Sequence, residues 1–106
     1  MEANHLVVFV TTPTKEVGEQ IAKSLVEAQL AACVNLLPEI TSIYTWEGEV
    51  CHEAEVMMVI KTQAKLFEAL ADTIQTLHPY HVPEIIAVPI IAGSANYLAW
   101  IETVTQ

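Results

Sequence analysis

The sequence predicts an α+β domain in which two β-α-β halves interleave into one antiparallel sheet. Apolar runs rich in β-branched residues alternate with segments of helical spacing, in the order β-α-β-β-α-β followed by one more helix. A Glu-Gly-Glu turn joins two of the strands directly, which is typical of an antiparallel hairpin. The length of 106 residues fits a single domain spanning 1–106.

The first two elements are a buried strand and an amphipathic helix. His5–Thr12 is a continuous run of β-branched and aromatic residues, which is typical of a central strand. Pro13 then opens a helix, and Thr14 is its expected N-cap. Apolar side chains recur at helical spacing along one side of this helix: Val17, Ile21, Leu25 and Ala28.

The next two strands form an unusually long hairpin. Cys33–Trp46 is strand-like, and Pro38 predicts a bulge or an edge because proline cannot donate to a ladder. Glu47–Glu49 is the turn, with Gly48 left-handed, and the return strand covers Val50–Thr62. Arms of this length would project beyond so small a domain unless another chain paired with them. The hairpin therefore indicates an oligomer.

The remaining elements complete the pattern. A helix is expected over Ala64–Leu77, and Pro79 ends it. Its apolar stripe consists of Leu66, Leu70, Ile74 and Leu77. Glu84–Ile91 reads as a buried strand interrupted by Pro89, and Ser94 is the expected N-cap of the last helix. The whole order predicts a ferredoxin-like split βαβ plait, with two helices on one face of an antiparallel sheet.

Composition narrows the function classes. Hydrophobic residues make up 53% and charged residues 16% of the chain, which is too apolar for disorder and favours self-association of so small a domain. Four lysines, no arginine and a net charge of -9 argue against nucleic-acid partners and anionic membranes. Cations are attracted instead.

Cysteine usage and the N-terminal region predict a cytoplasmic protein. Cys33 and Cys51 lack the C-x-x-C spacing of iron–sulfur, zinc-ribbon and thioredoxin-type sites, and a reduced setting is the simpler interpretation. The apolar run from Leu6 is short and has no basic flank, so no signal peptide is expected. No apolar run approaches the roughly 18 residues of a membrane helix.

The stretch LHPYHVPEI contains the best candidate metal ligands. His78, His81 and Glu84 are spaced three apart, and imidazole with carboxylate suits Cu(II), Ni(II) or Zn(II). Pro79 and Pro83 stiffen the backbone between them. The alternative interpretation is a rigid connector between a helix and a strand, with the histidines at the surface. Other candidate ligands are weaker, since the adjacent Cys51 and His52 face opposite sides of a strand.

Carboxylates and aromatic residues define two further candidate features. Glu47, Glu49, Glu53 and Glu55 form either a solvated face of the hairpin or a weak divalent-cation surface. The second feature is a ligand cleft, for which the candidates are Lys61, Tyr80, Glu84 and Trp100. Lys61 either pairs with a glutamate such as Glu84 or meets an anionic ligand there. The aromatic residues serve as interface anchors in the alternative interpretation.

Conventional catalysis finds no support in the sequence. The nucleophile-elbow, zinc-protease and phosphate-loop motifs are missing, and the chain has only three glycines. We therefore expect neither an enzyme nor an organic cofactor.

Several short motifs in series resemble the CutA family of divalent-cation tolerance proteins, and the match covers nearly the whole chain. They are LAACVNLLP (30–38), SIYTWEGEV (42–50), EVMMVIKT (55–62), HPYHVPEI (78–85) and NYLAW (96–100). The resemblance implies a cytoplasmic homotrimer of ferredoxin-like subunits whose hairpins and sheet edges pair between subunits. It also implies an association with tolerance to copper and other divalent metals.

The resemblance bears on metal binding and suggests a second function. Copper-binding members of the family are proposed to use a cysteine late in the first strand and two successive histidines before Pro-Tyr. The matching positions here are Val10, Leu77 and His78, so only one ligand is kept. Either His81 compensates for the lost ligands or binding is weak. The assembly also resembles the PII signalling proteins, which bind small effectors between subunits. A regulatory or scaffolding trimer, with a small-molecule or protein partner, is therefore the alternative.

Overall fold

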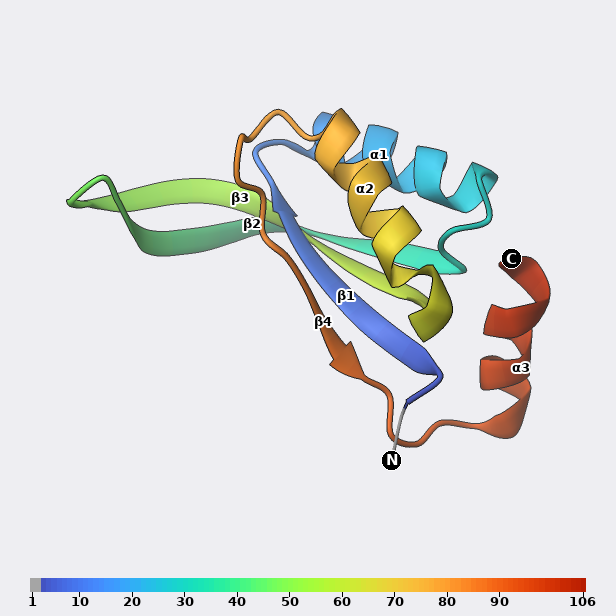
Figure 1. Ribbon diagram of the computed structural model, residues 1–106. Helices are drawn as coiled ribbons and strands as arrows, with labels where there is room; N and C mark the ends of the chain where they lie inside the picture. The colour runs from blue at the N-terminus through green and yellow to red at the C-terminus, as the bar shows by residue number, and fades with distance from the viewer. Residues whose placement is uncertain (1–2) are drawn as a thin grey trace.

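The computed structural model describes residues 3–106 as one four-stranded antiparallel sheet with its helices (Figure 1). The elements are β1 (His5–Thr12), α1 (Lys15–Glu27), β2 (Cys33–Trp46), β3 (Glu49–Gln63), η1 (Ala64–Leu66), α2 (Phe67–Leu77), β4 (Ile85–Pro89) and α3 (Ala95–Val104). The strand order is β2-β3-β1-β4, and every neighbouring pair is antiparallel. The predicted α+β class and the central position of the first strand are confirmed.

The core lies between the sheet and the helices α1 and α2, which run along the same face (Figure 1). Val8 and Val10 of β1 and Met58 and Ile60 of β3 are fully buried there. The helices contribute Ile21, Leu25, Leu70 and Ile74 to the same cluster. Burial of each such side chain is worth about 1.5–3 kcal/mol, so this face supplies most of the hydrophobic stabilisation.

The opposite face of the sheet is only partly covered. Side chains alternate along a strand, so the residues paired with Phe9 and Val7 of β1, which are Ile86 and Val88, point away from α1 and α2. Ile86 is 54% exposed and Val88 is 44% exposed. The prediction of a buried last strand is therefore wrong for the single chain. We call this surface, formed by Val7, Phe9, Val59, Ile86 and Val88, the open face.

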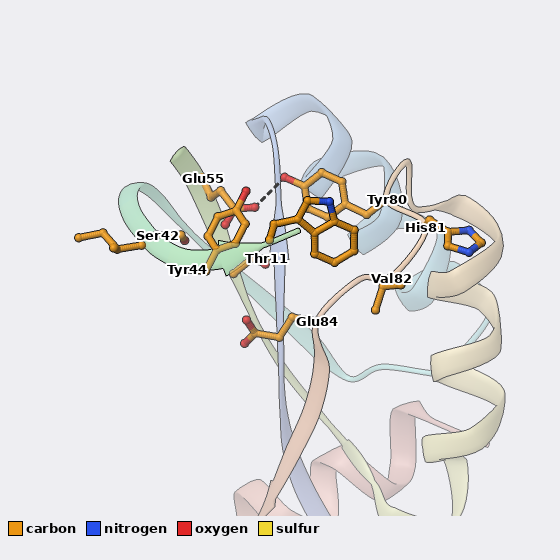
Figure 2. Close-up of a pocket in the computed structure, with 10 residues that line it drawn as sticks. Thr11, Ser42, Tyr44, Glu55, Tyr80, His81, Val82 and Glu84 are labelled. Carbon is orange, nitrogen blue, oxygen red and sulfur yellow. Dashed lines mark hydrogen bonds between the residues drawn. The ribbon is translucent and has the colours of Figure 1, made fainter. Parts of the chain in front are cut away.

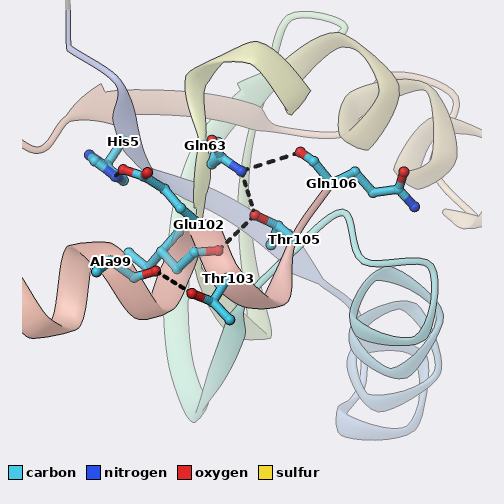
Figure 3. Close-up of polar contacts among 8 residues, drawn as sticks. His5, Gln63, Ala99, Glu102, Thr103, Thr105 and Gln106 are labelled. Atoms are coloured by element: carbon cyan, nitrogen blue, oxygen red, sulfur yellow. Dashed lines mark hydrogen bonds and ion pairs between the residues drawn. The ribbon is translucent and has the colours of Figure 1, made fainter.

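The helix α3 covers one end of the open face (Figure 3). The His5 imidazole donates to the Glu102 carboxylate over 2.7 Å, and the Gln63 amide donates to the Thr105 hydroxyl over 2.8 Å. Ile101 is fully buried beneath the helix. These contacts hold α3 where β1 begins and β3 ends, and they leave the middle of the open face uncovered.

The hairpin of β2 and β3 extends away from the body of the domain (Figure 1). A two-residue turn closes it, with φ of 51° at Glu47 and 81° at Gly48. Left-handed backbone at both positions matches the right-handed twist of the strands, and glycine adopts it without strain. The ladder shifts register between Leu37 and Ile40, so the bulge predicted at Pro38 is confirmed.

Helix boundaries follow the predicted signals closely. The hydroxyl of Thr14 accepts from the Val17 amide over 3.2 Å, and that of Ser94 accepts from the Tyr97 amide over 3.3 Å, so both predicted N-caps are confirmed. The helix expected from residue 64 begins as the short 3₁₀ turn η1 before α2. Within residues 3–106, no helix combines the length and the apolar character needed to cross a membrane.

Candidate functional site

A cavity of about 630 Å³ lies between the hairpin and the loop of residues 78–84 (Figure 2). Its volume falls within the range of roughly 300–1,000 Å³ found for small-molecule pockets. The side chains that matter for its chemistry are Tyr44, Trp46, Glu55, Tyr80, His81 and Glu84. The pocket thus combines aromatic rings with carboxylates, drawn from β2, β3 and the loop that follows α2.

His78 fixes the loop to the end of β1. Its side chain is buried, its Nε2–H donates to the Thr11 carbonyl over 2.8 Å, and its Nδ1 accepts from the Tyr80 amide over 3.1 Å. A carbonyl only accepts and an amide N–H only donates, so the two partners determine the tautomer. Both ring nitrogens are therefore engaged, and His78 presents no free lone pair to a metal in this conformation.

Tyr80 and Glu55 form the polar contact inside the pocket (Figure 2). The Tyr80 hydroxyl donates to the Glu55 carboxylate over 2.7 Å, and Glu55 is only 7% exposed. Burial, reinforced by the hydrogen bond to the charged Glu55, raises the pKa of Tyr80 well above its ordinary value of 10.0. Tyr80 therefore remains a neutral donor to the Glu55 carboxylate.

Tyr44 repeats this arrangement nearer the tip of the hairpin. Its hydroxyl donates to Glu53 over 3.3 Å. Desolvation, with the charge of Glu53, raises the pKa of Tyr44 as well. Both phenols thus stay uncharged while their rings line the cavity.

The three predicted metal ligands are divided. His81 and Glu84 line the pocket, whereas the ring of His78 is hydrogen-bonded to the backbone of Thr11 and Tyr80. Within residues 3–106, no group of three or more His, Cys, Asp or Glu side chains is arranged to hold a metal ion. The structure therefore does not preassemble the trio of His78, His81 and Glu84 as one site.

Only two of the four residues predicted for the ligand cleft lie in the pocket. Tyr80 and Glu84 line the pocket, but Lys61 lies six residues along β3 from Glu55, roughly 20 Å at strand spacing. Lys61 donates to the side chain of Asn35, so of its two predicted roles the pairing with Glu84 is not seen among the described residues. Trp100 lies on α3, where its ring packs against Tyr97 at 5.4 Å between centroids.

The hairpin carboxylates also separate into two groups. Glu47, Glu49 and Glu53 are exposed, as a solvated face requires, but Glu55 is buried against Tyr80. The interpretation of the run as solvated is therefore wrong for Glu55. The burial of Glu55 could have been inferred from its position, because it is the glutamate of this run nearest the body of the domain. Cys33 and Cys51 are free thiols and half-buried.

Comparison with known proteins identifies close relatives. The family model described as CutA1 divalent ion tolerance protein matches residues 6–104. "Protein CutA" of Homo sapiens is 50% identical over 98 residues, which are 92% of this chain and 55% of that protein. The "Divalent-cation tolerance protein CutA" of Thermus thermophilus is 50% identical over 95 residues, covering 90% of this chain and 92% of that protein. The chain thus spans about half the length of the human relative.

Solved structures agree with these relationships. A divalent cation tolerance protein from Thermus thermophilus superposes with a TM-score of 0.94 at 47% identity, covering 96% of this chain and 99% of that chain. CutA1 from Oryza sativa superposes with a TM-score of 0.95 at 44% identity, covering 98% and 95% respectively. The whole described fold is therefore shared with these proteins.

Proposed function

The chain belongs to the CutA family of divalent-cation tolerance proteins, and on this premise we propose that it acts as a cytoplasmic homotrimer that binds divalent cations weakly. One observation carries the proposal: His81 and Glu84 line the same pocket of a chain with a net charge of -9. The related CutA of Archaeoglobus fulgidus is described as a periplasmic protein. Fractionation of the native host cells tests the cytoplasmic location.

The proposed trimer has a structural reason in the surface that one chain leaves bare. Large exposed hydrophobic side chains lie on the open face and the hairpin, among them Ile43, Trp46, Val50, Ile86 and Val88. β2 and β4 are the edge strands of the sheet and present unpaired backbone groups. Pairing of ferredoxin-like subunits through these edges and hairpins would cover both the apolar and the polar surfaces.

Weak binding follows from the ligands that the pocket supplies. One imidazole and one or two carboxylates suit Cu(II), Ni(II) or Zn(II), and water would complete the coordination. Glu55 is engaged by Tyr80, which leaves His81 and Glu84 as the available groups. Val10, which stands where the family's copper-binding cysteine is expected, is fully buried in the core. Neither Cys33 nor Cys51 lines the pocket, so no thiolate strengthens the site in the described chain.

Native mass spectrometry during a Cu(II) titration tests the proposal. We expect a trimer that takes up one ion per chain, with uptake lost in the double variant His81→Ala, Glu84→Gln. His52→Ala is the matched control, because His52 is exposed on the hairpin outside the pocket and its loss should leave uptake unchanged. Uptake that persists in the double variant would contradict the site, and a monomeric wild type would contradict the assembly.

The pocket also favours a second function, that of a PII-like regulatory trimer with a small-molecule ligand. A cavity of about 630 Å³ is far larger than a metal ion requires, and Tyr44, Trp46 and Tyr80 add three aromatic rings to its lining. Aromatic walls with a few polar groups are typical of sites for organic ligands. A non-metal mass adduct that survives on the trimer purified from its host would support this function.

A further inference from the structure

The hairpin of β2 and β3 contains one interruption, and it lies where the support of a third strand ends. Two residues of β2, Pro38 and Glu39, fit opposite the single residue Val56 of β3. Thr12 of β1 pairs with the same Val56, and β1 ends there. Beyond this point the hairpin continues as two strands, and Figure 1 shows it curving away from β1. An extra residue in one strand bends that strand and increases its twist.

The bulge is held in place although its backbone is strained. Glu39 has φ of 62°, a left-handed conformation that favours glycine. Pro38 has no N–H to donate to a regular ladder, and the tight turn at Glu47 and Gly48 fixes the register at the other end of the hairpin. Because the Glu39 side chain is exposed, the strained backbone serves the path of the strand and not a contact in the core.

A small change in this bend moves the far end of the hairpin a long way. Beyond the bulge, residues 40–46 pair with residues 49–55, and this part is roughly 23 Å long at strand spacing. Over that length, a change of roughly 12° in the bend displaces the tip by about 4.8 Å, which is the distance between neighbouring strands. A change of that size would place the tip beside the wrong strand of a partner.

We propose that the bulge at Pro38 and Glu39 sets the angle at which the hairpin reaches the next subunit, and that this angle closes the assembly at three copies. Copies joined head to tail form a ring only when the rotation between neighbours closes, and they form open chains otherwise. The bulge lies between the packed sheet and the projecting part, whose exposed apolar residues include Ile43 and Val50. The inference rests on the homotrimer of the proposed function and names what determines its closure.

A hairpin without the bulge tests the proposal. Deletion of Glu39 combined with Pro38→Val leaves one residue opposite Val56, so the other cross-strand pairs are kept and the extra residue is lost. In native mass spectrometry of the full chain, we expect a trimer for the wild type. For this variant we expect loss of the trimer, with monomers or a broad series of larger assemblies in its place.

Glu39→Gly is the matched control, because glycine adopts φ of 62° without strain and the bulge is kept. We expect this variant to remain a trimer. Circular dichroism and urea denaturation confirm that each variant is folded before its mass is measured. Deletion of Glu39 alone, which keeps the native proline, is the second variant if the first does not fold.

Two results would overturn the proposal and leave the proposed trimer intact. A variant without the bulge that still forms a discrete trimer would show that the bend does not determine closure. Loss of the trimer in Glu39→Gly would assign the effect to the glutamate side chain instead of the backbone. A monomeric wild type is a different failure, because it would contradict the proposed assembly and this inference with it.

Discussion

The two faces of the sheet carry similar apolar side chains but meet different surroundings. On one face, Val8, Val10 and Ile60 are fully buried beneath α1 and α2. On the open face, Ile86 and Val88 remain about half exposed. The strands are the same, and successive residues simply point to opposite sides. The contrast teaches that the chain buries one of its apolar faces itself and leaves the other for a partner.

The largest expected effect is on assembly. Ile86→Glu places a charge on the open face, where it is tolerated in one chain but would be buried in a trimer at a cost of roughly 3–5 kcal/mol per copy. We expect light scattering to report a monomer for this variant. Val26→Glu is the control, because Val26 is 43% exposed on α1 and away from the open face. If the Ile86→Glu variant were still a trimer, the open face could not be part of the subunit interface.

The next effect is on the covered face. Leu70→Ala removes a fully buried side chain from the core and should lower the free energy of unfolding by about 3 kcal/mol. Leu77→Ala, in the same helix but 38% exposed, should cost much less. Urea denaturation measures both variants. Equal losses would mean that assembly buries Leu77 as deeply as the core buries Leu70.

The loop after α2 offers the same comparison between two histidines. His78→Ala deprives the buried Thr11 carbonyl and the Tyr80 amide of their partner and should cost about 2 kcal/mol of stability. His81→Ala removes an exposed side chain and should stay within about 0.5 kcal/mol. For metal uptake we expect the reverse order, with the larger loss in His81→Ala and the smaller loss in His78→Ala. If His78→Ala left stability unchanged, the inference that His78 fixes the loop to β1 would be wrong.

The smallest expected effect concerns the hydrogen bond in the pocket. Tyr80→Phe should cost about 1.5 kcal/mol at neutral pH, since the lost bond was to a charged group. The raised pKa of Tyr80 contributes stability below the ordinary value of 10.0, and that contribution declines as the pH rises beyond it, because the unfolded tyrosine ionises first. The gap between wild type and variant should therefore narrow above that pH. A constant gap would show that Tyr80 ionises equally in both states.

Much of the fold was predictable because its signals are local. The caps at Thr14 and Ser94, the bulge at Pro38 and the turn at Gly48 each depend on the conformational preferences of a few residues. The site was less predictable because its members are far apart in sequence. Tyr80 meets Glu55 across a separation of 25 residues, and nothing local to either residue indicates that contact.

Tertiary structure decided which of these histidines and glutamates are buried and which line the pocket. His78 and His81 stand in the same short motif, yet one is buried against β1 and the other lines the pocket. Glu53 and Glu55 lie on the same side of one strand, yet only Glu55 is buried by the loop. Composition and spacing determined the elements, the family resemblance and the presence of surplus apolar surface. Which polar groups are satisfied within the chain, and which are left to hold a ligand, depends on packing between distant segments, because a hydrogen bond requires its partner within about 3 Å.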